Sequence, residues 1–371
     1  MTPIQSKIAL PLALLALAAA PAVAAGADRD RPAGRPAKLQ RALDRVVAAG
    51  APGTLAIVRD RDRTIRLASG YADLKARRPM RATDRFRIGS VTKTFVATVV
   101  LQLVGEGRLA LTDTVEDRPG LVPNGHAITV RQLLNMTSGL FDYPNDPRIF
   151  APFLHGDLAH AWTPRELVAV ATSHAPLFAP GTGYAYCNTC YVLLGLMIEA
   201  ASDNPLNAEL RQRILEPLRL RATSFPTTPR IAGRHAHGYM RVGQPSLEDV
   251  TALNPSWGWA AGAIVSTPDD VARFYRALLG GRLLRPKLLR AMRTTVAGNA
   301  GTRYGLGIGT LRLPCGPAWG HQGGIIGYDA WALASRDGKR QTVVFTNLEG
   351  SSFSKRAEAA RDRLIATAYC G

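Results

Sequence analysis

Segments with strand character lie near both ends of this chain of 371 residues, and helical or loop-like segments lie between them. Residues 54–59 and 64–70 flank a charged turn, and residues 325–335 and 342–347 flank an Asp-Gly turn. The four segments can share one sheet only if the two ends of the chain come together. This requirement constrains the fold more than any other feature of the sequence.

The pattern predicts an α/β (α+β) fold with an antiparallel sheet built from both chain termini and flanked by helices. The sheet regions are about 38–90 and 300–371, and a large helical insertion occupies about 91–299. Apolar periodicity and capping residues predict helices at the following positions: 39–47, 90–104, 129–135, 191–201, 206–218, 268–279 and 353–368.

The first 25 residues have the composition of a Sec-type signal peptide. Lys7 precedes an apolar run at 8–20, and the small residues at 21–25 offer a cleavage site. The run is too short to span a membrane, no cysteine follows it, and the C-terminus has no hydrophobic tail. We therefore expect a secreted protein of the extracellular or cell-envelope space without a membrane anchor. Residues 26–37 would form a flexible leader and residues 38–371 the folded domain.

The formal net charge of +18 does not by itself indicate a nucleic-acid partner. Outside the cytoplasm, an anionic partner would be wall polymer or phospholipid. Most of the 46 basic residues are arginines scattered without a long block, which favours an arginine-rich background composition. We expect no nucleic-acid partner, and the sequence does not indicate an oligomeric state.

Four cysteines in an exported chain raise the question of disulfides. A bond between Cys315 and Cys370 would tie the tail to the segment before His321, and we expect this pairing. Cys187 and Cys190 either pair with each other or stay reduced. A zinc site needs four ligands, and no second close Cys or His pair accompanies them, so we expect no metal and no cofactor.

Ser90 and Lys93 have the spacing of a nucleophile and its proton acceptor. Residues three apart share a helix face, so the lysine amine can reach the serine hydroxyl. A serine hydroxyl needs a neighbouring base, and a lysine can act as one when its pKa is lowered. Ser90 would also lie at a helix N-terminus, where free N–H groups favour developing negative charge.

Tyr186 and Asn188 form a second candidate element. A phenol near the serine and lysine can relay a proton to a leaving group, and an amide can bind a substrate amide or orient the lysine. Tyr143 and Asn145 form a competing Tyr-x-Asn, but they lie among residues typical of turns, so we interpret them as structural.

Gly320-His321-Gln322-Gly323-Gly324 is the third element, and it precedes the predicted strand at 325–335. His321 there can act as a hydrogen-bond partner in a cleft. The backbone N–H groups of Ser90 and Gly324 can together form an oxyanion hole.

Two other matches are interpreted as structural. Ser352 and Lys355 repeat the Ser-x-x-Lys spacing, but they open the final helix with little chain beyond them. Ser202-Asp203-Asn204 ends a helix and precedes a proline, as a helix terminator does.

The three elements, in this order, resemble the motifs of the serine β-lactamase and penicillin-binding-protein superfamily: Ser90-x-x-Lys93, Tyr186-x-Asn188 and His321-x-Gly323. The sequence segments at 133–140, 180–191 and 259–267 also resemble those of the superfamily. The similarity extends from about residue 39 to residue 368. Within the superfamily the chain resembles the class C-like branch that holds the secreted D-alanyl-D-alanine carboxypeptidases. The resemblance implies a β-lactamase/transpeptidase-like fold.

The resemblance also implies a role for each motif residue. Ser90 would attack a carbonyl and form an acyl-enzyme, and Lys93 would take or relay its proton. Tyr186 would deliver the proton to the leaving amine and later help to activate water. Asn188 would bind the acyl-side amide, and His321 would stand where β-lactamases of this type hold a lysine.

Departures from the family pattern concern the substrate. The residues implied in substrate binding are Asn188, Gln322, Gly323 and Arg312. Gln322 and Gly324 occupy positions where related carboxypeptidases tend to carry hydroxyl residues near the substrate's carboxylate. The basic residue that the family pattern places upstream of the His321 motif is displaced in this chain, which leaves Arg312 or Arg303 as substitutes. No Lys-Ser/Thr-Gly occurs in the chain, which favours a peptidase or related hydrolase over a β-lactamase.

The resulting expectation is an exported serine D-alanyl-D-alanine carboxypeptidase that acts on peptidoglycan-type peptides and binds β-lactams covalently. A second hypothesis keeps Ser90 but makes the chain a D-aminopeptidase or amidase, an esterase or a β-lactamase. A third, from a different class, is a non-catalytic protein that binds the cell wall or β-lactams. The neutral form of His321 is expected to be needed, so that activity falls at acid pH.

Overall fold

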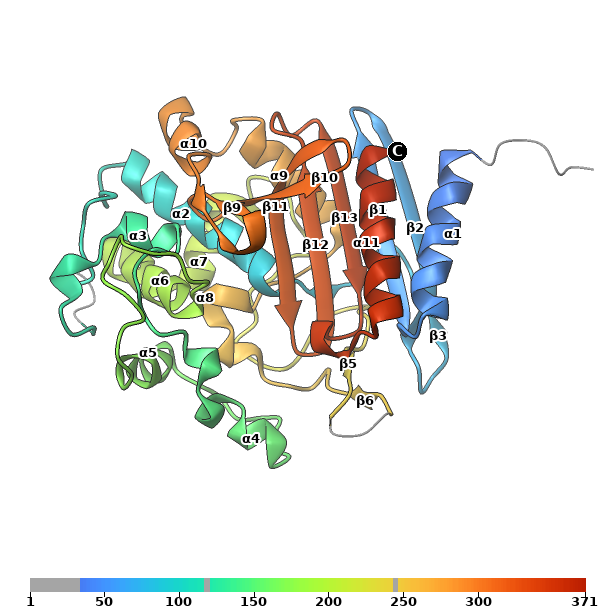
Figure 1. Ribbon diagram of the computed structural model, residues 1–371, viewed down its shortest axis with the longest axis horizontal. Coiled ribbons are helices and arrows are strands. Elements are labelled where there is room, and N and C mark those ends of the chain that lie inside the picture. Colours follow the sequence, from blue (N-terminus) through green and yellow to red (C-terminus); the bar gives the residue numbers. More distant parts are fainter. Residues whose placement is uncertain (1–33, 117–120, 243–245) are drawn as a thin grey trace, which may run out of the picture. The chain divides into compact units, whose positions relative to one another are not determined.

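The computed structural model describes residues 34–116, 121–242 and 246–371, and Arg35–Gly371 form one compact unit (Figure 1). The predicted signal peptide and most of the predicted leader lie outside the described residues. The end of the leader belongs to helix α1 (Arg35–Ala48). Pro36 lies in the first turn of this helix, where the missing N–H of a proline costs no hydrogen bond.

The main sheet has nine strands, and each neighbouring pair is antiparallel. Its spatial order is β3-β2-β1-β13-β12-β11-β10-β9-β8. The strands are β1 (Gly53–Asp60), β2 (Arg63–Asp73), β3 (Arg78–Pro79), β8 (Val296–Ala297), β9 (Arg303–Tyr304), β10 (Gly309–Leu313), β11 (Gly316–Ile325), β12 (Tyr328–Ala334) and β13 (Arg340–Thr346).

The two ends of the chain meet in the interior of this sheet. Strand β1 pairs with β13, and Thr54 lies opposite Thr346 with their hydroxyl oxygens 3.1 Å apart. The remaining strands continue outward on both sides of this pair. The predicted α/β (α+β) class, with an antiparallel sheet drawn from both termini, is therefore confirmed.

Helices cover both faces of the sheet (Figure 1). Helix α1 and the final helix α11 (Lys355–Cys370) lie on one face, where Leu43 and Leu364 join a small apolar core with alternate strand residues such as Leu333. Ala332, its neighbour on β12, belongs instead to the large core on the other face. This alternation follows from the two-residue period of a strand.

The helical part of the chain packs around helix α2, which is apolar on all sides and almost wholly buried. Helices α6 and α8 lie against it. The helices of this part are α2 (Thr92–Gly105), α3 (Val130–Leu134), α4 (Ala151–Leu154), α5 (Pro164–Thr172), α6 (Asn188–Ser202), α7 (Leu206–Leu210), α8 (Trp259–Gly262), α9 (Pro268–Leu279) and α10 (Pro286–Met292).

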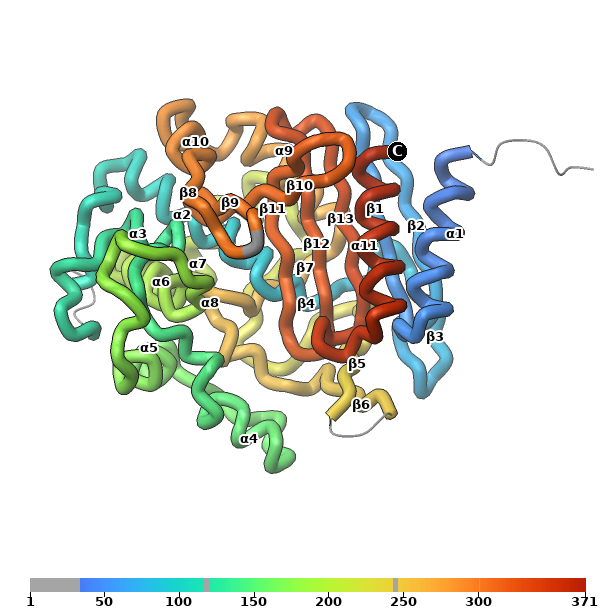
Figure 2. The backbone as a smooth tube through the Cα atoms, in the orientation of Figure 1, coloured from blue at the N-terminus to red at the C-terminus, as the bar shows by residue number. Residues whose placement is uncertain are grey.

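Two short two-stranded ribbons lie outside the main sheet in the described part of the chain, and Figure 2 labels their strands. They are β4 (Phe86–Arg87) with β7 (Val265–Ser266), and β5 (Tyr239–Met240) with β6 (Glu248–Asp249). The first ribbon leads directly into the segment around Ser90. Its pairing is extended by a hydrogen bond from Ile88 N to the carbonyl oxygen of Ile264 at 2.9 Å.

The motif around His321 lies inside a strand, which differs from the expected position before a strand. Strand β11 ends at Ile325, and a turn with Gly327 at φ 87° separates it from β12. The glycines of the motif therefore do not serve a loop. A Cβ on Gly320 would lie 1.9 Å from the carbonyl oxygen of Ala332, so glycine permits close contact of neighbouring backbones. The predicted helix at 206–218 is also shorter, because a π-helical turn follows α7.

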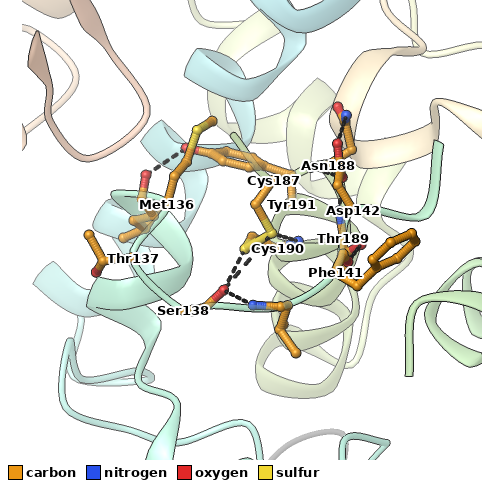
Figure 3. The surroundings of a disulfide bond; sticks show 12 residues. Met136, Thr137, Ser138, Phe141, Asp142, Cys187, Asn188, Thr189, Cys190 and Tyr191 are labelled. Carbon is orange, nitrogen blue, oxygen red and sulfur yellow. Dashed lines mark hydrogen bonds between the residues drawn. A yellow bond between two sulfur atoms is a disulfide. The ribbon is translucent and has the colours of Figure 1, made fainter. Parts of the chain in front are cut away.

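Two disulfide bonds are present. The predicted bond between Cys315 and Cys370 joins the hairpin of β10 and β11 to the end of α11. Cys187 and Cys190 also form a bond, which resolves the alternative that the sequence leaves open (Figure 3). This second bond is buried at the start of α6, and the hydroxyl oxygen of Ser138 lies 3.0 Å from the sulfur of Cys190.

No helix in the described part of the chain is long and apolar enough to cross a membrane. Among the same residues, no group of three or more His, Cys, Asp or Glu side chains could hold a metal ion.

Candidate active site

Ser90 lies in a tight turn directly before helix α2. The turn, Gly89–Val91, is a 3-10 helix, so Ser90 precedes the first α-helical residue. Gly89 has φ 49°, and a Cβ on it would lie 2.6 Å from the carbonyl oxygen of Gly324. Glycine at this position allows the serine turn to lie against strand β11. Ser90 and Gly324 consequently line the same cleft, as an oxyanion hole made of their N–H groups requires.

Lys93 is fully buried, and its Nζ has three hydrogen-bond acceptors. Nζ lies 2.9 Å from Ser90 Oγ, 2.7 Å from Asn188 Oδ1 and 2.8 Å from the carbonyl oxygen of Ala261. An ammonium group donates to all three, whereas a neutral amine donates to two and directs its lone pair at the third. The oxygens of Asn188 and Ala261 can only accept, so the lone pair of the neutral amine faces the Ser90 hydroxyl.

Burial lowers the pKa of Lys93 to about 7, and the negative charge of Asp142 opposes part of this decrease. The neutral amine is therefore well populated near neutral pH. A general base works best with a pKa close to the operating pH. Lys93 thus has both the position and the pKa to remove the proton of Ser90.

Tyr186 differs from Lys93 in its protonation state. Burial raises the pKa of its phenol well above the usual value, although a hydrogen bond with Ser90 acts in the opposite direction. The phenol therefore keeps its proton at neutral pH. Lys93 Nζ lies 4.8 Å from the centre of the Tyr186 ring. The site thus holds one group able to accept a proton and one able to donate a proton, both beside Ser90.

Asn188 begins helix α6 and joins Lys93 to the buried carboxylate of Asp142. Figure 3 shows Asn188 beside Asp142. Its Nδ2 donates to Asp142 Oδ2 at 2.8 Å, while its Oδ1 accepts from Lys93. Asp142 Oδ1 accepts from the backbone N–H groups of Asn188 at 2.5 Å and Thr189 at 3.2 Å. Both ends of the Asn188 amide are therefore engaged within the protein, and only the second hydrogen of Nδ2 can face a substrate.

His321 is buried on β11, and both ring nitrogens have partners. Nδ1 contacts the carbonyl oxygen of Gln322, which can only accept, so Nδ1 carries the proton. Nε2 then accepts from the hydroxyl of Tyr304 at 2.9 Å. Burial, together with the charge of Lys93, lowers the pKa of His321 to about 3. The imidazole consequently stays neutral throughout the range in which Lys93 titrates.

The motif residues open onto a cleft of about 650 Å³. Its polar lining consists of Ser90, Tyr186, Asn188, His321, Gln322, Gly324, Glu349 and Ser351. Its apolar lining consists of Pro144, Phe150, Phe153, Leu154, Met240, Trp257, Ile325 and Ile326. Leu154 is 65% exposed, and the rings of Phe150 and Trp257 meet edge to face with centroids 5.0 Å apart. The cleft is therefore lined by a large apolar surface, called here the apolar wall, as well as by the polar residues around Ser90.

Two residues predicted to bind substrate do not line this cleft. Arg312 is exposed on β10 and pairs with Pro317, which is four residues before His321 on β11. Four residues span about 13 Å along a strand, which separates Arg312 from the motif. Gly323 is covered instead of exposed, since a Cβ on it would lie 2.0 Å from the carbonyl oxygen of Ile88.

Gln322 and Asn188, the other two residues predicted to bind substrate, do line the cleft. The side chain of Gln322 contacts a buried carboxylate, since its Nε2 lies 3.3 Å from Asp329 Oδ1. Arg303, the other proposed substitute for the displaced basic residue, donates from Nε to the hydroxyl of Thr295 at 2.8 Å and does not line the cleft.

The competing motifs have structural roles. The hydroxyl of Tyr143 donates to the carbonyl oxygen of Trp257, and Ser352 accepts from Arg241 N at 2.9 Å. Asp203 ends helix α6 with φ 56°. These contacts agree with the interpretation drawn from the sequence.

The sequence reasoning missed four groups of the site: Asp142, Ala261, Tyr304 and Glu349. Asp142 lies two residues after the family-like segment at 133–140, among the residues around Tyr143 that are typical of turns. Ala261 acts through a backbone oxygen, which no side-chain pattern reports. Tyr304 and Glu349 lie far from the motifs in sequence and reach them only through the sheet.

A profile of the beta-lactamase family matches residues 39–367 of the chain. A crystal structure of the D-stereospecific amidohydrolase from a Streptomyces species is 40% identical in sequence, with a TM-score of 0.80 over 87% of this chain and 97% of that one. The D-amino acid amidase from Ochrobactrum anthropi SV3, complexed with L-phenylalanine amide, is 29% identical, with a TM-score of 0.80 over 89% of this chain and 97% of that one.

Among curated proteins, the D-aminopeptidase from Brucella anthropi is 28% identical over 322 residues, or 82% of this chain. The chain spans 57% of the length of that relative. The predicted resemblance to the superfamily is confirmed by these matches, while the class C-like branch is not tested by them.

Proposed function

The chain belongs to the beta-lactamase family, and from this premise we propose that it cleaves the amide bond that follows an N-terminal D-amino acid. The substrates would be D-amino-acid amides or short D-peptides. Its relatives support this D-aminopeptidase or amidase reading better than the D-alanyl-D-alanine carboxypeptidase that the sequence first suggests.

The charge of the cleft is the observation that carries the proposal. Among the described residues that line it, Glu349 is the only carboxylate, and there is no arginine or lysine. A carboxypeptidase must hold the carboxylate at the end of its substrate, which Glu349 would repel. An aminopeptidase or amidase must hold an α-ammonium group, which a carboxylate attracts.

The apolar wall supports a substrate with a large apolar side chain. Phe150, Phe153 and Trp257 present aromatic surface to the cleft, and Leu154 is highly exposed there. Burial of an aromatic or branched side chain against this wall would stabilise binding by about 1.5–3 kcal/mol.

The proposed reaction follows from the protonation states at Ser90. Neutral Lys93 takes the proton of the Ser90 hydroxyl while the oxygen attacks the amide carbonyl. The N–H groups of Ser90 and Gly324 stabilise the oxyanion. Tyr186 donates its proton to the leaving nitrogen and regains one from Lys93, which leaves an ester on Ser90. Water then attacks this ester with the same groups acting in reverse, and the free D-amino acid and Ser90 are restored.

Kinetics on four substrates test the proposal: D-phenylalanine amide, L-phenylalanine amide, N-acetyl-D-phenylalanine amide and diacetyl-L-lysyl-D-alanyl-D-alanine. We expect D-phenylalanine amide to be hydrolysed fastest and its N-acetyl form at least about tenfold more slowly, because acetylation removes the ammonium group. Ser90→Ala should abolish turnover. Faster release of D-alanine from the tripeptide would overturn the proposal in favour of a carboxypeptidase.

The other hypotheses predict different results in the same assays. An esterase or β-lactamase would prefer a p-nitrophenyl ester or nitrocefin. A non-catalytic binding protein would turn over none of the substrates, and Tyr186→Phe would not alter its binding. Intact-mass measurement after exposure to penicillin shows whether β-lactams acylate Ser90.

We also propose that the protein is exported. The sequence of the first 25 residues supports this, and so do the two disulfides, which are typical of oxidising compartments. Cell fractionation together with N-terminal sequencing of the recovered protein tests the proposal; recovery of an unprocessed chain in the cytoplasm would contradict it.

A further inference from the structure

We propose that Asp142 is a positioning residue for acyl transfer, which holds the amide of Asn188 in the one orientation that presents an acceptor to Lys93. The inference rests on the proposed serine chemistry but not on the identity of the natural substrate. Asp142 does not line the cleft and would not touch substrate.

The side-chain amide of Asn188 has an accepting end and a donating end, and its orientation decides which end faces Lys93. The side chain of Asn188 could face Lys93 with either its oxygen or its NH₂ group. An ionised carboxylate can only accept hydrogen bonds, so Asp142 requires the NH₂ group of Asn188 on its own side. The oxygen of the amide must then face Lys93, as the contacts of 2.8 Å and 2.7 Å show.

Asp142 is itself held in place by the start of helix α6. Its Oδ1 accepts from two backbone N–H groups of the first turn, those of Asn188 and Thr189, and its Oδ2 accepts from Asn188 Nδ2. Both carboxylate oxygens are thus committed (Figure 3). Since the carboxylate is only 7% exposed, water cannot readily substitute for these donors.

The segment that carries Asp142 has anchors of its own. The Thr189 hydroxyl donates to the carbonyl oxygen of Phe141 at 2.7 Å and accepts from Tyr143 N at 3.1 Å. These two bonds flank Asp142 on both sides and do not use its carboxylate. An isosteric replacement of Asp142 should therefore preserve the fold of this segment while removing the charge.

Asp142 also acts on Lys93 through its negative charge. Burial raises the pKa of Asp142 above its usual value, while its hydrogen bond with Asn188 and the charge of Lys93 on α2 act against this increase. Asp142 in turn raises the pKa of Lys93 against the effect of burial. Glu349 lines the cleft, but it is not among the groups that shift the pKa of Lys93. The other titratable groups around Lys93 and Asp142 are phenols and an imidazole, which are neutral near pH 7: Tyr143, Tyr186, Tyr191, Tyr304 and His321. Asp142 is therefore the negative charge that balances protonated Lys93 when it has taken the proton from Ser90.

The test follows the acylation of Ser90 by p-nitrophenyl acetate as a function of pH, with stopped-flow release of p-nitrophenolate and intact-mass measurement of the adduct. This ester does not require recognition of an amino acid. If the wild type acylates with the ester but hydrolyses no D-amino-acid amide, the proposed substrate fails while Asp142 is still tested.

Asp142→Asn is the first variant. We expect the acylation rate at its optimum to fall by about 10-fold to 100-fold, because the new amide can turn Asn188 around. The acid limb of the pH profile, which we expect near pH 7 in the wild type, should move to lower pH because the neutral form of Lys93 no longer competes with an ion pair. A purely structural role would lower the rate without moving the limb.

The exchanged pair, Asp142→Asn with Asn188→Asp, is the second variant. It keeps one carboxylate and one amide, but it places the carboxylate directly against Lys93. The acid limb should then move to higher pH than in the wild type. This variant also serves if Asp142→Asn alone fails to fold, and failure of both to fold would assign Asp142 a structural role and overturn the proposal.

Asp146→Asn is the matched control. Asp146 is a buried aspartate on the same segment, and it contacts Arg148 at 2.6 Å and His174 at 2.7 Å, outside the cleft. Its replacement should lower thermal stability and leave the acid limb in place. The proposal is overturned if Asp142→Asn acylates at the wild-type rate or keeps the wild-type acid limb.

Discussion

Tyr304 donates its hydroxyl to Nε2 of His321 at 2.9 Å, while Nδ1 of the same ring donates to the carbonyl oxygen of Gln322. The imidazole is thus held between a phenol and the backbone and has no N–H free for a substrate. His321 is therefore a neutral, oriented part of the cleft wall.

Tyr304→Phe removes the donor and leaves Nε2 of a buried imidazole without a partner. The free energy of unfolding should decrease by about 1–3 kcal/mol, the cost of an unsatisfied buried acceptor. Urea denaturation followed by tryptophan fluorescence measures this loss. An unchanged midpoint and slope would show that the Tyr304 hydroxyl contributes nothing to the folded state.

The acid limb of kcat/KM should arise from Lys93. Acylation requires the neutral amine, and the pKa of Lys93 is lowered to about 7, so activity falls as the pH decreases through this value. The pKa of His321 is lowered to about 3, and the ring is already neutral over this interval. His321→Gln should therefore keep the acid limb of the wild type, even if its maximal rate is lower. The earlier expectation that protonation of His321 causes the acid loss is replaced by this one.

Glu349→Gln should weaken the binding of substrates that carry an α-ammonium group. The amide can still accept the hydrogen bond that Ser351 N donates at 2.7 Å, so the local turn should persist. Loss of the charge should raise KM for D-phenylalanine amide by about tenfold, equivalent to about 1.4 kcal/mol, and leave acylation by p-nitrophenyl acetate unchanged. Glu358→Gln, on the exposed side of α11, is the control and should change neither value. Equal effects of Glu349→Gln on both substrates would rule out recognition of the ammonium group.

Gly323→Ala and Gly324→Ala form a matched pair of neighbouring substitutions. A Cβ at residue 323 would lie 2.0 Å from the carbonyl oxygen of Ile88, whereas one at residue 324 meets nothing within 4 Å. We expect Gly323→Ala to lower the free energy of unfolding by about 1–3 kcal/mol or more, because the serine turn must move away from β11. Gly324→Ala should have a thermal midpoint close to that of the wild type. Similar midpoints for the two variants would mean that the turn and the strand are not in close contact.

Replacement of Cys315 and Cys370 by serine should destabilise the fold through the unfolded state. The two cysteines are 55 residues apart in sequence, and closing a loop of this size contributes about 4 kcal/mol in the chain-entropy description. The site lies elsewhere, so kcat/KM at 25 °C should be retained. Chemical denaturation of the variant and of the oxidised wild type measures the difference, and activity assays on the same samples provide the control.

The elements that can be predicted from the sequence are those specified by residues close together in the chain. Strands β1 and β2 follow from their strand character around a charged turn, and helix α9 follows from its periodicity and the Ser-Thr cap before it. Ser90, Lys93 and Tyr186 were found because each belongs to a short motif, and the structure brings them together in one site. Sequence reasoning also identified the Cys315–Cys370 bond.

What the sequence could not predict depends on contacts between distant segments. The family resemblance suggests Arg312 as a substitute for a displaced basic residue, but the register of β10 against β11 places it away from the motif. Glu349 follows the last strand and enters the cleft only because β13 lies inside the sheet. Asp142 resembles an ordinary turn residue until helix α6 is placed over it. The pKa values of Lys93 and His321 reflect burial, which local composition does not specify.

The contact of Thr54 with Thr346 also sets the order in which this protein can be assembled. These residues are 292 positions apart, so the interior of the sheet cannot close until nearly the whole chain has been synthesised. Pairings of such long range form slowly. In a nascent chain, strand β1 therefore stays without its partner until β13 has been made, and the edge of β1 that pairs with β13 is unpaired during synthesis.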